Sequence, residues 1–210
     1  MAEELGKIEK PSVESFSGSR KLIVAPLLFS GKDAPEDFMT IFNRCWDQTK
    51  EQLANLESKL GAVTLIYHEM LFESGEKGLS ILEQLNPHSF QFVKAKTENG
   101  AKIEVVEEID IATENMDWER CLMVAMGPVA RNKLSELYIA SSTKRFELIA
   151  RKIDESLKEG EIGLLITREG HRTQFPQSIE VFNIYPPALD ELNRWLREYT
   201  EKNKTASPGS

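Results

Sequence analysis

Apolar residues along the chain fall into short continuous runs and longer helical stripes, and the two alternate. The runs LIVAPLLF (residues 22–29) and IGLLIT (residues 162–167) are strand-sized and almost wholly apolar. Strands of this kind are typical of parallel sheets that helices cover on both faces. Because Pro26 has no amide hydrogen, we expect the first strand to be an edge strand or to contain a bulge. The expected strands are residues 22–29, 62–67, 103–106, 162–167 and 179–184.

Between these runs, apolar residues recur at the spacing of an amphipathic helix. The strongest stripe covers residues 35–60, where we expect Asp33 to cap the helix and Gly61 to end it. A long helix is expected over residues 129–158, with a weak point at Ser141–Ser142. Further helices are expected over residues 77–85 and 118–126 and after Pro187, while residues 90–96 fit either a strand or the start of a helix.

This alternation predicts a three-layer α/β/α sandwich around a mostly parallel or mixed sheet of about five strands. We expect a single domain over residues 21–203, preceded by a flexible arm (residues 1–20) and followed by a disordered tail (residues 204–210). A chain of 210 residues with 40% hydrophobic content can build a core without disulfides or metals. In such folds, ligands bind beyond the carboxyl ends of the strands.

Charge and cysteine content narrow the range of partners. The net charge of −8 disfavours direct binding to nucleic acid, whose phosphates attract clustered basic residues. Residues 104–110 carry several acidic residues, which we expect to lie at a solvated strand end. The two cysteines, Cys45 and Cys121, are expected to pack as small apolar side chains. No apolar run is long enough to span a bilayer and no signal-peptide pattern is present, so we expect no membrane partner and a cytoplasmic location.

The sequence lacks the motifs of several enzyme classes. The lone glycine of SGK at residues 30–32 does not have P-loop spacing, and no GxSxG elbow occurs. His68 and Glu69 come nearest to a metal pair, but adjacent residues of a strand point to opposite faces of the sheet. We therefore expect no cofactor and no metal site, and the sequence does not decide whether the chain is an enzyme.

The segment after residues 162–167 concentrates chemically active side chains in the run REGHRTQFP. Two arginines at this position can hold a carboxylate or a phosphate, and a histidine titrates near neutral pH. The alternative is a solvated connection whose charges only keep the loop in water. Catalytic residues stay unknown, and the candidate binding residues are Arg168, Glu169, His171 and Arg172.

Residues 159–169 (EGEIGLLITRE) lead from a helix into an apolar strand and a polar loop, before another strand and helix. This succession resembles the last domain of archaeo-eukaryotic class 1 peptide-chain release factors and pelota. The resemblance implies an α/β/α domain that binds partners. The Gly-Gly-Gln loop that triggers peptide release is absent, so that activity is not implied. The run REGHRTQFP and the run PPALDE at residues 186–191 are also similar to a group of short uncharacterised prokaryotic proteins.

Two functional hypotheses follow. The first is a non-enzymatic binding or regulatory domain that acts through protein partners, in a translation-related setting if the resemblance extends to function. The alternative is a small-molecule hydrolase or transferase that uses the loop 168–176 to bind an anionic substrate. In both cases we expect a homodimer, because the apolar stripes of the helices exceed what one five-stranded sheet covers.

Overall fold

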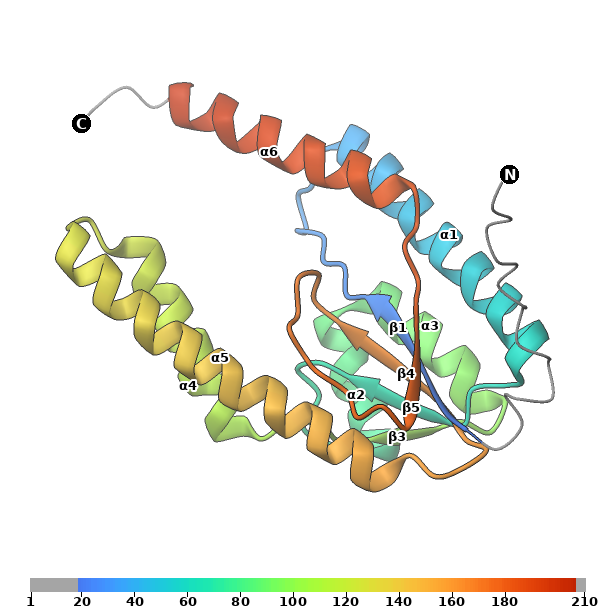
Figure 1. Cartoon of the computed structure of the whole chain (residues 1–210). Coiled ribbons are helices and arrows are strands. Elements are labelled where there is room, and N and C mark those ends of the chain that lie inside the picture. Colours follow the sequence, from blue (N-terminus) through green and yellow to red (C-terminus); the bar gives the residue numbers. More distant parts are fainter. Residues whose placement is uncertain (1–18, 207–210) are drawn as a thin grey trace, which may run out of the picture.

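The computed structural model describes residues 19–206, which form one five-stranded sheet with helices on both faces (Figure 1). All strand pairs are parallel, so the predicted α/β/α class is confirmed, and the five predicted strands share this sheet. Residues 1–18 of the predicted arm and residues 207–210 of the predicted tail lie outside the described residues. In the order β3-β2-β4-β1-β5, the sheet contains β3 (Lys102–Glu104), β2 (Leu65–His68), β4 (Ile162–Thr167), β1 (Arg20–Pro26) and β5 (Ile179–Asn183).

Two separate apolar clusters hold the three layers together. Alternate residues of β1 point to opposite faces, so Ile23 packs in one cluster and Leu22 in the other. The first cluster contains side chains of α1, α2, α3 and α6, and the second contains side chains of α5 and of the loop between β4 and β5. The helices are α1 (Glu36–Leu60), α2 (Gly75–Leu85), α3 (Pro87–Glu98), α4 (Ile109–Val124), α5 (Pro128–Ser156) and α6 (Ala188–Ala206).

The first strand lies inside the sheet, so the expectation of an edge strand or a bulge is wrong. β1 pairs with β4 on one side and with β5 on the other, without interruption. Pro26 is its last residue, opposite Thr167, and the next amide, that of Leu27, donates to the Thr167 carbonyl over 2.7 Å. At the end of a strand, the missing amide hydrogen of proline breaks no interior bond of the ladder.

Several helix ends differ from their predictions. Asp33 does not cap α1, because Pro35 occupies the N-cap position, whereas Gly61 ends the helix with a φ of 112° as expected. Residues 90–96 are helical within α3, whose first turn is capped by Asn86: its side chain accepts a hydrogen bond from the Ser89 amide at 3.1 Å. The helix predicted from residue 118 begins at Ile109, nine residues earlier.

Helices α4 and α5 form a hairpin that projects beyond the sheet (Figure 1). α5 runs without a break through Ser141–Ser142, so the predicted weak point is absent. The reason is that both hydroxyls face α4, where the Asn115 side-chain amide donates to them over 3.0 and 2.8 Å. Only the C-terminal part of α5, which includes Ile149 and Ile153, packs on the sheet.

Candidate functional site

The connections that leave β2 and β4 run in opposite directions across the sheet. The chain after β2 passes through α2 and α3 to β3, on the face that α1 covers. The chain after β4 crosses β1 to reach β5, and Phe175 of this loop packs on the opposite face with α5. The carboxyl ends of β2 and β4 are therefore the topological switch point of the sheet, which is where open α/β sheets bind their ligands.

A cavity of about 720 Å³ lies near the carboxyl end of β4, between α5 and the loop that follows β4. The wall formed by α5 combines the apolar side chains of Ile139 and Phe146 with hydroxyl groups and Glu147. The opposite wall is formed by the loop after β4, which contains the run REGHRTQFP at residues 168–176. The loop residues that line the cavity are Arg168, Glu169, Gly170, Arg172 and Gln174.

Arg168 is held in place at the end of β4. Its backbone amide donates to Oε2 of Glu69 over 2.7 Å, and its Nε donates to Oε1 of the same carboxylate. Its Nη1 lies 3.5 Å from a carboxylate oxygen of Glu119 in α4. Two carboxylates thus fix the plane of the guanidinium group, while the side chain stays 30% exposed. An arginine oriented in this way is preorganised to bind an oxyanion at its remaining edge.

Glu69, which anchors Arg168, directly follows β2 and is fully buried. Its carboxylate also accepts a hydrogen bond from the Thr167 hydroxyl at 2.7 Å and lies 3.2 Å from the Arg145 guanidinium. Burial by itself raises the pKa of Glu69, but the charges of Arg168 and Arg145 and the hydrogen bonds to the carboxylate hold it below its usual value. Glu69 is therefore ionised at neutral pH.

Arg145 and Glu107 extend this buried charge cluster toward the helical hairpin. The acidic residues 104–110 were expected in solvent, and for Glu107 this is wrong, because only 2% of the residue is exposed. Its carboxylate accepts hydrogen bonds from Nε of Arg145, at 3.0 Å, and from Nη2. It also accepts one at 3.2 Å from the amide of Met70, which has a φ of 69° directly after Glu69. The cluster thus joins the end of β2 to α5.

The buried cluster of Glu69, Glu107 and Arg145 was not predicted from the sequence. Glu69 was considered only as part of a metal pair. The burial of Arg145 could have been predicted from the sequence. Arg145 lies one helical turn from Ile149 and so falls on the buried stripe of α5. A charged residue on such a stripe must have buried partners of opposite charge.

Arg172 and Glu169 are exposed at the mouth of the cavity. Within residues 19–206, Arg172 has no ion-pair partner. The Glu169 carboxylate accepts a hydrogen bond from the Asn193 side chain of α6 at 2.7 Å. With Arg168, these are three of the four predicted binding residues, and all three line the cavity.

His171, the fourth predicted residue, is not among the residues that line the cavity. Its Nδ1 is enclosed and has no hydrogen-bond partner. Burial lowers the pKa of His171, and the negative charge of Glu69 only partly opposes this effect. The imidazole is therefore neutral at pH 7.

His68 and Glu69 diverge, as expected of neighbouring residues at a strand end. The His68 ring is hydrogen-bonded to the Ser89 hydroxyl at 2.8 Å, on the α3 side of the sheet. Burial lowers the pKa of His68 to about 4, so the ring is neutral. Across residues 19–206, no three side chains of His, Cys, Asp or Glu are grouped so as to hold a metal ion.

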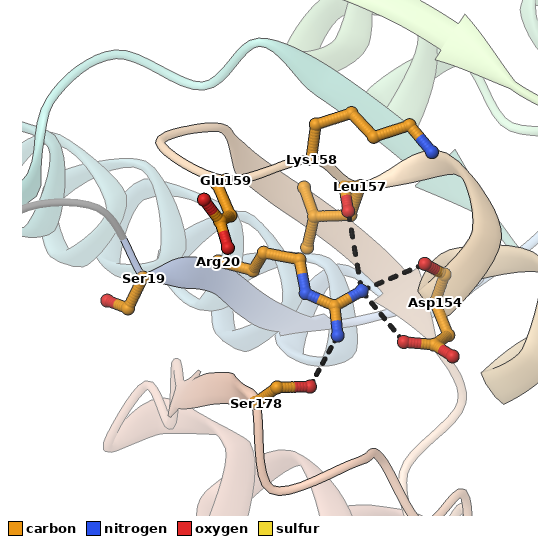
Figure 2. Close-up of a pocket in the computed structure, with 7 residues that line it drawn as sticks. All are labelled: Ser19, Arg20, Asp154, Leu157, Lys158, Glu159 and Ser178. Carbon is orange, nitrogen blue, oxygen red and sulfur yellow. Dashed lines mark hydrogen bonds and ion pairs between the residues drawn. The ribbon is translucent and has the colours of Figure 1, made fainter.

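A smaller cavity, of about 310 Å³, lies at the other end of the strands, where β1 and β5 begin (Figure 2). There the Arg20 guanidinium donates to the carbonyl and the carboxylate of Asp154, over 2.8 and 2.7 Å, and to the Ser178 hydroxyl. Arg20 thus joins the start of β1 to the end of α5 and to the start of β5. Both Nη groups of Arg20 already donate to protein groups, so we interpret this site as structural.

Comparisons of the chain with family models, with curated proteins and with solved structures found no match. The resemblance to release factors and pelota therefore stays a prediction. None of the described helices is both long and apolar enough to cross a membrane.

Proposed function

We propose that this chain is a binding domain for a small organic molecule that carries an anionic group. The proposal rests on one observation: Arg168 and Arg172 line the same cavity at the carboxyl edge of the sheet. Arg168 offers the remaining edge of its guanidinium group in a fixed orientation, because its other donors are bound to Glu69 and Glu119. Arg172 is the second donor group, and no carboxylate of the described chain neutralises it. Guanidinium groups are the preferred partners of carboxylates and phosphates, so two of them on one cavity favour a ligand with such a group.

The other residues of the cavity refine the ligand class. Glu147 and Glu169 also line it, so its formal charge is balanced. This balance disfavours a bare anion and favours a molecule that has hydrogen-bond donors as well as an anionic group. Phe146 and Ile139 offer an apolar surface for the body of such a ligand. The volume of about 720 Å³ is in the range of cavities that hold drug-sized molecules.

Binding without chemistry is favoured over the hydrolase or transferase alternative. That alternative requires His171 to exchange a proton with the ligand. His171 does not line the cavity, and its lowered pKa reflects an enclosed ring. A general acid or base needs hydrogen-bond reach to its substrate, directly or through one water molecule.

Substituting Arg172 should weaken ligand binding without affecting the fold. We expect Arg172→Gln to reduce affinity roughly 10- to 100-fold, the value of a charge-assisted hydrogen bond. The melting temperature should stay unchanged, because the side chain is exposed. The measurement is isothermal titration with adenosine monophosphate, citrate and inorganic phosphate as probes.

The matched control is Arg197→Gln, which removes an exposed arginine of α6 outside the cavity and should bind like the wild type. Adenosine monophosphate or citrate should bind more tightly than inorganic phosphate. Equal affinities for the two variants, or no binding of any probe to the wild type, would contradict the proposed function.

A further inference from the structure

The outer part of the α4–α5 hairpin has no core of its own. From Met116 to Ala140, a stretch that contains both helix ends and the turn between them, not one residue is buried. Near the turn, four apolar residues are largely exposed: Met123 by 72%, Val124 by 77%, Met126 by 97% and Val129 by 83%. Apolar surface gathered on a projecting element is typical of an interaction site.

Two helices alone do not cover each other's apolar faces. Helical hairpins of this kind are stable in bundles, where a second pair of helices supplies the missing half of the core. On the outer hairpin, Trp118, Leu122, Leu134 and Leu137 are only partly buried. These side chains would form the centre of such a bundle, and the exposed residues near the turn would extend it.

The charges on the hairpin are separated along its length. Residues 109–119 of α4, at its base, contain acidic residues and no basic residue: Asp110, Glu114, Asp117 and Glu119. Residues 120–135, around the turn, contain basic residues and no acidic residue: Arg120, Arg131 and Lys133. The remainder of α5, residues 136–156, carries four acidic and four basic residues. The base of the hairpin is therefore net acidic, through α4, and its end is basic.

We propose that two copies of this chain pair through their hairpins in antiparallel orientation, as a homodimer with two-fold symmetry. In this arrangement the basic end of each hairpin lies against the acidic base of the other, and the favourable contact occurs twice. End-to-end pairing of two identical turns would instead bring like charges together. The charge separation therefore favours a second copy in one orientation.

At the base, Glu108 and Glu114 pair with Lys152 and Lys144 of α5. Nearer the turn, the existing ion pairs do not oppose the pairing of two hairpins. Arg120 with Asp117, and Lys133 with Glu136, are exposed pairs three residues apart on one helix. Such pairs contribute little to stability and can exchange partners. Arg131 and Asp110 have no ion-pair partner within residues 19–206.

Sedimentation equilibrium at tens of micromolar should give twice the chain mass of 23.8 kDa. Met126→Glu should weaken the dimer by at least roughly tenfold, because it places a charge in the apolar contact. At a concentration low enough for both proteins to be monomeric, Met126→Glu should not lower the melting temperature relative to the wild type. The reason is that Met126 is 97% exposed in the single chain. The matched control is Leu85→Glu, which changes an exposed leucine of α2 and should leave the dimer intact.

The antiparallel orientation is tested by charge reversal. Arg131→Glu and Asp110→Lys should each weaken the dimer, and the double variant should recover much of the wild-type affinity. A monomeric wild type, or a dimer that Met126→Glu leaves unchanged, would overturn the proposal. Failure of the double variant to recover would overturn the antiparallel orientation. None of these residues lines the cavity, so the result does not depend on the proposed ligand.

Discussion

Replacing Arg145 by alanine is expected to lower the free energy of unfolding by about 3–5 kcal/mol at pH 7. Arg145 is 1% exposed, and its guanidinium group faces the buried carboxylates of both Glu107 and Glu69. The variant leaves two negative charges in the interior with a single remaining partner, Arg168, on Glu69. Urea unfolding followed by circular dichroism measures the loss, and the sheet and α5 should be the elements that loosen.

The same variant should show a distinct dependence on pH. In the wild type the pKa of Glu69 lies below its usual value of 4.5. Its contribution to stability is therefore present above pH 4.5 and is lost as the pH falls through the lower native pKa. Without Arg145 that pKa rises, so the difference between variant and wild type should be largest at neutral pH and shrink below about pH 4.5.

The control for this prediction is Arg151→Ala, which removes an arginine of the same helix. Arg151 is exposed, and its one ion-pair partner among the described residues is Glu155, at 4.0 Å. This substitution should change stability by no more than about 0.5 kcal/mol. A loss below about 1 kcal/mol for Arg145→Ala would show that water reaches the cluster and that its charges are not buried.

Leu165→Ala should cost about 2–5 kcal/mol of unfolding free energy. Leu165 is fully buried in β4 and packs against α5 in the cluster that contains Ile149 and Ile153. Two close-packed layers meet there, so they are not free to collapse into the space that the lost methyl groups leave. Val181→Ala on β5 is the comparison, since that side chain is 39% exposed and should lose much less. Similar losses for the two variants would contradict the assignment of the core.

The three central strands, β2, β4 and β1, were predictable from the sequence because strands buried on both faces are almost wholly apolar. The run of residues 162–167 coincides with β4 for this reason. The start of α4 was not predictable from apolar spacing. In α4 only Ala112 and Asn115 are buried, so the first turns of this helix show no apolar stripe in the sequence. Its acidic first turn fits a helix N-terminus, whose dipole favours negative charge.

The loop side of the candidate site was predictable from the sequence, but the residues that hold Arg168 were not. The loop with Arg168 and Arg172 follows a buried strand directly, so its position in a parallel sheet follows from the strand alone. The residues that fix Arg168 were not visible in this way. Glu69 and Glu119 are far from Arg168 in the sequence, and only the order of the strands and the return of the hairpin bring them together.

Amide chemical shifts test most directly whether the cavity between α5 and the loop after β4 binds an anionic ligand. Adenosine monophosphate is titrated into the isotope-labelled wild-type protein. We expect saturable shifts on both walls, at Gly170 and Arg172 in the loop and at Ser142 and Phe146 in α5. Amides around Arg20, at the other cavity, should not move. Shifts confined to the surroundings of Arg20, or no saturable shift on either wall, would contradict ligand binding in the cavity between α5 and the loop after β4.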